Sequence, residues 1–128
     1  MDKNTSFELK NTDRESINEL IIDSIKDLKG KNIVKLDMRS ISGSPADYFI
    51  ICEGDSTIHV SSIAGNIYKR MKQEMDTLPL SYEGKNNSTW MLIDYFTTVV
   101  HVFYPETRKF YNLESLWNDA EKETFVED

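Results

Sequence analysis

The stretch that decides the fold spans residues 83–117 and reads EGKNNSTWMLIDYFTTVVHVFYPETRKFYNLESLW. Residues 88–95 alternate as a β-strand does, with two sets of side chains on opposite faces. The sets are Trp90, Leu92 and Asp94 on one face, and Met91, Ile93 and Tyr95 on the other. Residues 98–104 are β-branched and aromatic, which also favours a strand. Because only a short gap around Phe96 and Thr97 separates the two runs, the pattern predicts an antiparallel hairpin.

The predicted hairpin places a large aromatic ring beside a carboxylate. If the face with Ile93 is the core face, Trp90 and Asp94 share the opposite face, two pleats apart. In one interpretation a helix covers Trp90, and Asp94 only ends the strand. In the other, the two residues form a recognition patch, because protein interfaces use aromatic anchors next to charged groups. The pattern leaves both interpretations open.

Upstream of the hairpin the sequence predicts a helix and a strand. Thr12 followed by Glu15 fits a capping box, and apolar residues then recur at helical spacing until Gly30 stops the helix. The apolar residues are Ile17, Leu20, Ile21, Ile25 and Leu28. Residues 34–38 alternate between apolar and charged side chains, which indicates a strand near a sheet edge.

A second strand and a second helix follow. Residues 48–52 are apolar without alternation, which predicts a central strand covered on both faces. Asp55 or Ser56 can cap the next helix. Its predicted buried stripe is Val60, Ile63, Ala64, Ile67, Met71 and Met75. Residues 78–82, interrupted by Pro79, predict a short edge strand, and residues 113–117 predict a terminal helix that packs back.

The order helix, strand, strand, helix, hairpin, short helix predicts an α/β or α+β fold with a mixed β-sheet flanked by helices. A chain of 128 residues fits one domain. We expect a flexible N-terminus at residues 1–11, a domain at residues 12–117 and an acidic, flexible tail at residues 118–128.

Composition and charge limit the classes of partner that the protein can bind. Hydrophobic residues at 39% and charged residues at 29% are typical of a globular domain, and no apolar run reaches the ~20 residues of a membrane span. We therefore expect a cytoplasmic protein without a membrane partner. The net charge is −7, and the residues after Leu113 include six acids and only one base, Lys122. This excess argues against direct nucleic-acid binding and favours a basic protein partner.

A search for catalytic chemistry gives one weak candidate. Gly43 and Ser44 precede Glu53 and Asp55, and a glycine–serine turn with two metal-binding carboxylates is typical of nucleotidyl transfer. Gly54 separates the two acids at the strand's end, where their geometry would not be rigid. We therefore predict no catalytic residues there.

The remaining candidates have ordinary structural interpretations. The lone Cys52 lies in an apolar run, and with two scattered histidines it gives no zinc-ligand spacing. We interpret His59 and His101 as structural histidines. A basic run of Lys69, Arg70 and Lys72 predicts a solvated helix face, with RNA contact as the alternative.

Several motifs resemble the ribosomal silencing factor family, also called the Iojap family. The resemblance extends over about a hundred residues, from the first helix to Trp117. The matching features, in order, are Ala46-Asp47-Tyr48, Gly54, Ser56, His59-Val60, Glu83-Gly84, Trp90, Asp94-Tyr95, Val100-His101-Val102, Leu113-Glu114 and Leu116-Trp117. That combination is far more specific than any single short motif.

The resemblance implies a translational repressor without enzymatic activity, cofactor or bound metal. Members bind the free large ribosomal subunit through its ribosomal protein numbered fourteen and keep the small subunit away, whereas organellar relatives are linked to large-subunit assembly. The implied fold is related to nucleotidyltransferases and lacks their catalytic chemistry. Members often behave as homodimers, so a homodimer is also implied.

The resemblance also implies a site. The family's contact to the ribosomal protein centres on the tryptophan and aspartate of a W-x-x-x-D pattern, here Trp90 and Asp94. Neighbouring contacts would include Met91 and Tyr95, and the predicted supporting residues are Glu83 and His101. One departure is visible: the family usually has Gly-Asp after this strand, where this chain has Phe96-Thr97. A turn that needs a positive φ would be strained with phenylalanine, which leaves the turn type open.

Overall fold

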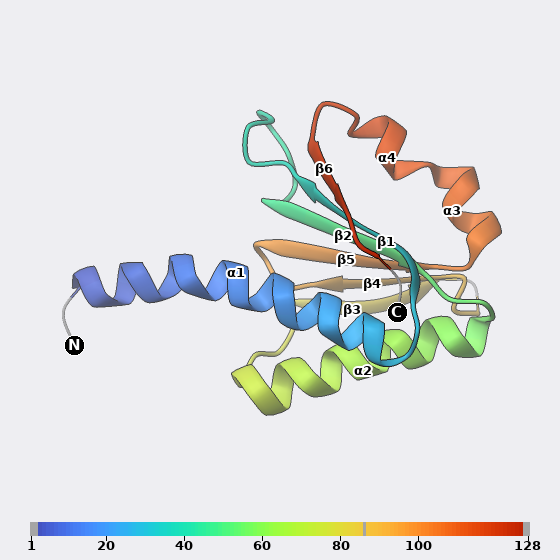
Figure 1. Ribbon diagram of the computed structural model, residues 1–128, viewed down its shortest axis with the longest axis horizontal. Helices are drawn as coiled ribbons and strands as arrows, with labels where there is room; N and C mark the ends of the chain where they lie inside the picture. The colour runs from blue at the N-terminus through green and yellow to red at the C-terminus, as the bar shows by residue number, and fades with distance from the viewer. Residues whose placement is uncertain (1–2, 86, 127–128) are drawn as a thin grey trace.

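A six-stranded mixed sheet runs through the molecule in the order β3-β4-β5-β2-β1-β6 (Figure 1). In this computed structural model, residues 3–85 and 87–126 are described. The strands are β1 (Lys31–Asp37), β2 (Tyr48–Glu53), β3 (Ser81–Lys85), β4 (Trp90–Asp94), β5 (Thr98–Phe103) and β6 (Glu121–Thr124). β2 and β5 pair in parallel, and the four other pairings are antiparallel. The predicted α+β class with a mixed sheet is therefore confirmed.

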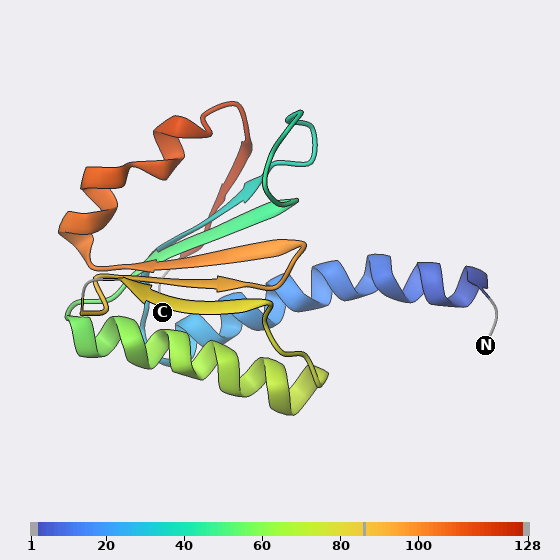
Figure 2. The same cartoon turned by 180° about the vertical axis from the view of Figure 1, so that it is seen from behind.

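The helices cover the two faces of the sheet unequally. α1 (Lys3–Asp27) and α2 (Thr57–Met75) lie together on one face, and the short α3 (Pro105–Tyr111) and α4 (Leu113–Leu116) lie on the other (Figures 1 and 2). The larger core lies under α1 and α2 and includes Ile21, Ile25, Ile63, Ile67 and Ile93. A smaller cluster lies on the α3–α4 face. None of the helices among residues 3–85 and 87–126 has the length and hydropathy to cross a membrane.

Local signals explain helix α2. Ser56 has extended backbone angles, and its hydroxyl accepts a hydrogen bond from the His59 N–H at 3.0 Å. The predicted stripe is buried from Val60 to Met71, and Met75 packs against the core from its rim. The helix ends at Asp76, which adopts a left-handed conformation with φ +49°.

Helix α1 begins earlier than the sequence predicts. It starts at Lys3 and runs through Thr12, so the predicted capping box does not begin the helix, and residues 3–11 of the predicted N-terminal segment are helical. Residues 1 and 2 lie outside the described residues. The physical reason is that no glycine or proline interrupts residues 3–27, so helical propensity allows the helix to extend past a possible cap.

Within the predicted acidic tail, residues 121–124 form strand β6, which pairs with the outer edge of β1. Within the sheet, Lys35 of β1 pairs with Glu123 at 3.2 Å. Lys122 pairs with Glu114 of α4 at 3.3 Å. Strand β1 is therefore next to the edge rather than at it. A count of charges along the tail could not show that Glu123 and Lys122 pair with residues outside the tail.

Candidate functional site

The predicted hairpin exists, and its register fixes which residues share a surface. β4 pairs with β5 so that Trp90 lies opposite Phe103, Leu92 opposite His101 and Asp94 opposite Val99. On the other side of β4, Glu83 of β3 lies opposite Leu92. Directly opposed residues point to the same face of a sheet. Trp90, Leu92, Asp94, Glu83 and His101 therefore share the face that α3 and α4 cover only in part, which we call the open face.

Trp90 is half-buried, between the two interpretations that the sequence left open. Helix α3 places Tyr111 against the indole, with ring centroids 4.5 Å apart, and Phe103 of β5 lies 5.0 Å away. Offset aromatic pairs at these distances hold the indole in one orientation. A helix therefore covers part of Trp90, and the rest of the side chain reaches solvent. Tyr111 was not identified from the sequence, because nothing local links it to a residue on β4.

His101 of β5 holds the Trp90 indole through a hydrogen bond. The Trp90 Nε1–H donates a hydrogen bond to His101 Nδ1 at 3.1 Å. His101 is only 4% exposed, and burial lowers its pKa to about 3. The imidazole is therefore neutral at pH 7 and accepts the indole N–H. Its Nε2 is buried without a hydrogen-bond partner among the described residues and lies in a ring of aromatic contacts that includes Phe49 at 4.5 Å.

Asp94 closes the hairpin turn. Its Oδ1 accepts the Phe96 N–H at 2.7 Å, and Phe96 has φ +76°. The Thr97 N–H donates to the Tyr95 carbonyl at 2.9 Å, which makes residues 95–97 a γ-turn with Phe96 at its centre. A non-glycine residue in this conformation is strained, and the Phe96 side chain is 73% exposed. The turn type is thus a strained γ-turn, stabilised by the Asp94 carboxylate.

Two of the predicted contact residues lie on the face of the sheet opposite Trp90. Met91 and Tyr95 are each 6% exposed and pack in the core under α1 and α2, away from Trp90. Their placement follows from alternation, since neighbours along a strand point to opposite faces. The structure therefore separates Met91 and Tyr95 from the open face. It brings together Trp90, Asp94, Glu83 and His101 there.

A buried arginine holds α3 and α4 against the sheet. Arg108 is 8% exposed, and its guanidinium donates to the Asn32 carbonyl at 2.7 Å and to Glu114 at 2.9 Å. The same group pairs with Glu53 at the end of β2, at 3.3 Å. A charged group this deeply buried is stable only when its donors are satisfied. Because Tyr111 lies one turn further along α3, Arg108 also sets the position of the ring that packs on Trp90.

Comparison with known proteins gives a consistent result. The family model described as "Ribosomal silencing factor during starvation" matches residues 11–128. The chain belongs to the ribosomal silencing factor family. The ribosomal silencing factor of Halalkalibacterium halodurans is 40% identical over 102 residues, covering 80% of this chain and 86% of the relative.

Family membership extends to the three-dimensional structure and to eukaryotic relatives. A crystal structure of a Chromobacterium violaceum protein superimposes with a TM-score of 0.76 and 32% identity, covering 88% of this chain and 92% of that one. A mouse protein named "Mitochondrial assembly of ribosomal large subunit protein 1" is 38% identical over 74 residues, 56% of this chain and 32% of the mouse protein. The silencing factor family takes its name from a regulatory role on the ribosome and not from a catalysed reaction.

The nucleotidyltransferase-like residues of this silencing factor do not converge. Ser44 donates to the carbonyls of Met38 and Ala46 and so closes the β1–β2 loop. That loop precedes β2, whereas Glu53 ends it, and a six-residue strand separates its ends by about 17 Å. Glu53 pairs with Arg108, and Asp55 pairs with Lys31 at 3.0 Å. The carboxylates of Glu53 and Asp55 are thus both in ion pairs with basic side chains of the protein.

The other candidates from the sequence have structural partners as well. His59 joins the ends of two helices: its Nδ1 accepts the Asp55 N–H at 2.8 Å, and its Nε2 lies 2.6 Å from the Leu28 carbonyl. Cys52 is completely buried, and burial raises its thiol pKa to about 12. These positions are consistent with the predicted structural roles.

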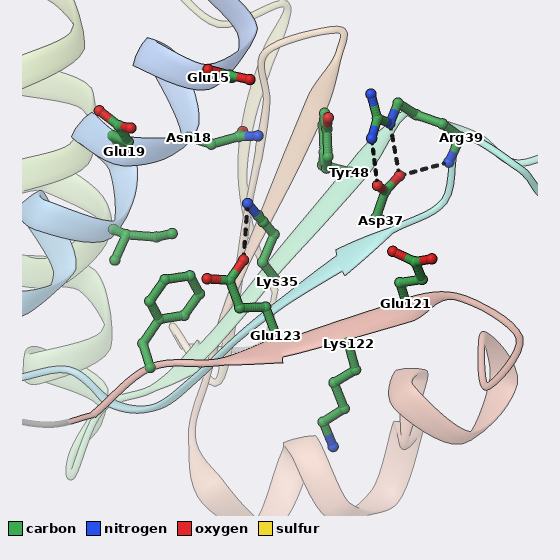
Figure 3. A pocket seen from close by; sticks show the side chains of 12 residues that line it. Glu15, Asn18, Glu19, Lys35, Asp37, Arg39, Tyr48, Glu121, Lys122 and Glu123 are labelled. Carbon is green, nitrogen blue, oxygen red and sulfur yellow. Dashed lines mark hydrogen bonds and ion pairs between the residues drawn. The ribbon is translucent and has the colours of Figure 1, made fainter.

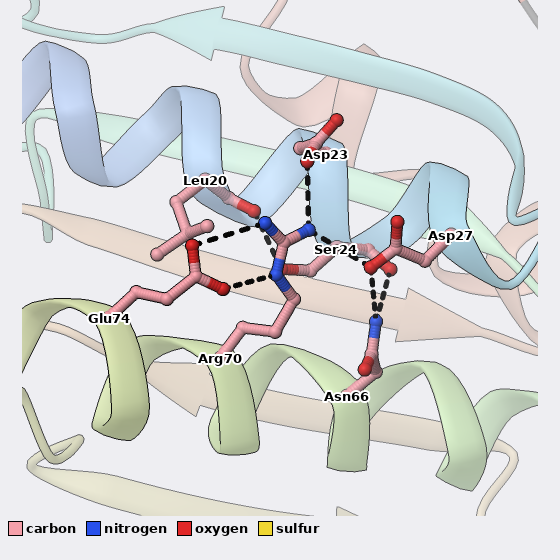
Figure 4. Close-up of polar contacts among 7 residues, drawn as sticks. All are labelled: Leu20, Asp23, Ser24, Asp27, Asn66, Arg70 and Glu74. Carbon is pink, nitrogen blue, oxygen red and sulfur yellow. Dashed lines mark hydrogen bonds and ion pairs between the residues drawn. The ribbon is translucent and has the colours of Figure 1, made fainter.

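The basic run on α2 is not a free cationic face. Figure 4 shows the Arg70 guanidinium between the two helices, where it pairs with Asp23 and Asp27 of α1 and with Glu74 of α2. The distances are 2.8, 2.9 and 2.6 Å. These hydrogen bonds, led by the one to Glu74, raise the pKa of Arg70. Of the three predicted RNA contacts, only Lys69 and Lys72 remain fully exposed.

Proposed function

We propose that this protein is a translational repressor that binds the free large ribosomal subunit through its ribosomal protein numbered fourteen and blocks association with the small subunit. The observation that carries the proposal is the half-exposed indole of Trp90 on the open face, held by His101 and Tyr111. A rigid aromatic side chain loses little entropy on binding, which is why tryptophan is enriched at interface hot spots.

The charge of the open face supports a basic partner. Glu83 and Asp94 lie on either side of Leu92, and no lysine or arginine forms an ion pair with either acid among the described residues. A lysine or arginine on the partner would therefore find two carboxylates beside an aromatic ring. Such complementarity speeds encounter and makes binding sensitive to salt.

Steric exclusion is sufficient for the mechanism. A standard interface covers about 800 Å² on each partner, so a domain of this size at the rim of the subunit contact overlaps with the incoming small subunit. Repression then follows mass action, because the silenced fraction depends on the concentration of the factor relative to its Kd. No turnover is required.

The test is sedimentation of purified subunits through a sucrose gradient with increasing concentrations of the protein. Wild type should reduce the joined particle and co-sediment with the large subunit. Trp90→Ala should bind about thirtyfold more weakly, which corresponds to roughly 2 kcal/mol for a central anchor. Ile58→Ala is the matched control, because Ile58 is a 76% exposed apolar side chain on α2, away from the open face.

The variants must be compared as folded proteins, since Trp90 also packs against Tyr111 and Phe103. Circular dichroism and thermal unfolding establish that state before binding is measured. Undiminished binding by folded Trp90→Ala removes Trp90 from the site. Equal losses in Trp90→Ala and Ile58→Ala would also count against the open face.

A role in large-subunit assembly is the second candidate, favoured by the name of the mouse relative. It predicts that cells without the protein accumulate immature large subunits even during growth in rich medium. The silencing proposal predicts normal large subunits and excess joined particles when nutrients run out. Gradient profiles of the two growth conditions separate these outcomes.

A further inference from the structure

A groove on another part of the molecule shares no lining residue with the open face. It is a half-open groove between α1 on one side and β1 and β6 on the other, with a volume of about 470 Å³. Figure 3 shows its lining, which includes Glu15 and Glu19 from α1, Lys35 from β1 and Glu121 from β6. Neither Trp90 nor Asp94 lines this groove, so an inference about it is independent of the proposed function.

The cations of the groove are already neutralised within the protein. Lys35 pairs with Glu123 at 3.2 Å. Arg39 binds the Asp37 carboxylate with two hydrogen bonds, at 2.9 and 2.7 Å. These donors are therefore committed to carboxylates of the same protein and do not offer charge to an anionic ligand.

Three carboxylates of the groove are left without such partners. Glu15 and Glu19 extend from α1, and Glu121 extends from the start of β6. All three are exposed, and none forms an ion pair with a residue in the described part of the chain. The groove thus presents uncompensated negative charge from two elements that face each other.

A buried amide points into the same space. Asn18 is 3% exposed, and its Oδ1 accepts the Thr98 hydroxyl at 2.6 Å. Its amide nitrogen makes no hydrogen bond within residues 3–85 and 87–126, and Figure 3 shows this nitrogen directed into the groove. This nitrogen is not one of the buried polar atoms that lack a partner among the described residues, so it is accessible from the groove. Asn18 therefore offers a donor to a carbonyl oxygen of a ligand, and this observation does not depend on the acids.

Apolar surface completes the lining. Ile22 of α1 and Phe125, which follows β6, also line the groove. A ligand with an aliphatic stem could therefore cover carbon while its charged end reaches a carboxylate. The Tyr48 ring adds a flat wall, with the Lys35 ammonium 5.7 Å from its centroid.

We propose that this groove is a docking site for a lysine- or arginine-bearing segment of a basic partner polypeptide. The cation would pair with Glu15, Glu19 or Glu121, its stem would pack on Ile22 and Phe125, and a backbone carbonyl would accept the Asn18 N–H. A nucleic acid would bring phosphates to unpaired carboxylates and is disfavoured. A simple polyamine has cations but no carbonyl for Asn18.

The probe is a blocked pentapeptide, acetyl-Arg-Gly-Arg-Gly-Arg-amide, titrated into the full chain by calorimetry at low ionic strength. We expect saturable binding with one site. The same peptide with citrulline in place of arginine keeps shape and carbonyls but has no charge, and it should bind at least tenfold more weakly. A dependence on salt should accompany the charged peptide.

Matched variants locate the site. The triple variant Glu15→Gln, Glu19→Gln, Glu121→Gln should weaken binding at least tenfold. The control triple variant Asp76→Asn, Glu106→Gln, Asp119→Asn removes the same charge from exposed acids outside the groove lining and should change the Kd less than twofold. Equal weakening in both triple variants would reduce the effect to net charge and overturn the proposal.

Nuclear magnetic resonance gives a readout that charge alone does not move. The side-chain amide of Asn18 should shift on addition of the peptide, while the indole N–H of Trp90 should not. A shift at Trp90 without one at Asn18 would place the peptide on the open face and overturn the proposal. Absence of binding by wild type would do the same. The groove variants should still co-sediment with the large subunit if Trp90 anchors that contact, so the two proposals fail separately.

Discussion

The two faces of strand β4 differ in what covers them. On one face Met91, Ile93 and Tyr95 are buried under α1 and α2. On the other, Trp90, Leu92 and Asp94 are half-buried, with the short α3 and α4 as the only helices over that face in the described part of the chain. Six consecutive residues, 90–95, thus serve a core and a surface at once. The same strand therefore supplies core packing on one side and, in the proposed function, a recognition surface on the other.

The incomplete cover is itself held in place. Arg108 joins α3 to β2 through Glu53 and to β1 through the Asn32 carbonyl. Tyr111 then reaches Trp90 without burying it. A longer helix at this position would have buried the indole as α1 and α2 bury Ile93. The open face therefore depends on the shortness of α3 as much as on the residues of β4.

The largest effect should come from the covered face. Ile93→Ala removes a completely buried side chain from the main core and should lower the free energy of unfolding by about 3 kcal/mol. Leu92→Ala, one residue away on the open face and half-buried, should lose about 1 kcal/mol. Urea denaturation of both variants measures the contrast. Equal losses would show that the open face is as tightly packed as the core.

Acid should lower the stability of the folded protein because His101 is buried in its neutral form. Its pKa in the folded protein, about 3, lies below its ordinary value of 6.5, so below pH 6.5 the unfolded chain binds a proton that the folded protein does not. This contribution to stability is complete above pH 6.5 and is lost as the pH falls toward 3. Between pH 7 and pH 5 the loss should be about 2 kcal/mol.

His101→Gln isolates that contribution, because glutamine does not titrate and still offers an acceptor to the Trp90 N–H. Urea denaturation at pH 7 and pH 5 should show a pH-dependent loss smaller by about 2 kcal/mol in the variant than in wild type. The lower absolute stability of the variant does not matter for this comparison. If the variant lost as much free energy of unfolding between pH 7 and pH 5 as wild type, His101 would not be buried in its neutral form.

Charge on the open face should have a smaller effect, on binding alone. Asp94→Asn keeps an oxygen for the Phe96 N–H and removes the charge, so it should weaken large-subunit binding about fivefold, roughly 1 kcal/mol. Asp94→Lys should be clearly worse, because it sets a cation against a basic partner. Co-sedimentation at two salt concentrations measures both. If the two variants bind alike, no basic group of the partner faces Asp94.

The smallest effect should be a gain in stability at the turn. Phe96→Gly replaces a residue at φ +76° with the one residue that adopts this conformation without steric strain. The relief is partly offset by the larger entropy of glycine in the unfolded chain, so the net gain should be about 0.5 kcal/mol. Thermal unfolding should show a slightly higher Tm. A lower Tm would mean that the exposed ring makes stabilising contacts of its own.

Much of the site could be predicted from the sequence because alternation is a local property. The pattern of residues 90–95 placed Trp90 and Asp94 on one face, and the register confirms it. The prediction that Met91 and Tyr95 join them came from the family resemblance and conflicts with that same alternation. Burial at 6% each follows the local rule.

Other parts could not be predicted, because they depend on segments far apart in the chain. Strand β6 was missed for this reason, because the charge of residues 121–124 does not show that they pair with β1. The sequence predicts a solvated Arg70, but the fold places Asp23 and Asp27 of α1 beside its guanidinium. Charge patterns show which groups are present and not which groups meet.

The sequence by itself determined the periodicities, and through them the hairpin, the capped helix α2, the mixed sheet and the two faces of β4. Only the tertiary structure decided that β6 completes the sheet, that Arg108 fixes α3, and that Tyr111 and His101 hold the Trp90 indole half in and half out of solvent. The physical reason is range. Backbone preference and side-chain alternation act between neighbours, whereas these contacts join residues separated by long stretches of chain and form only when the packed core brings them together.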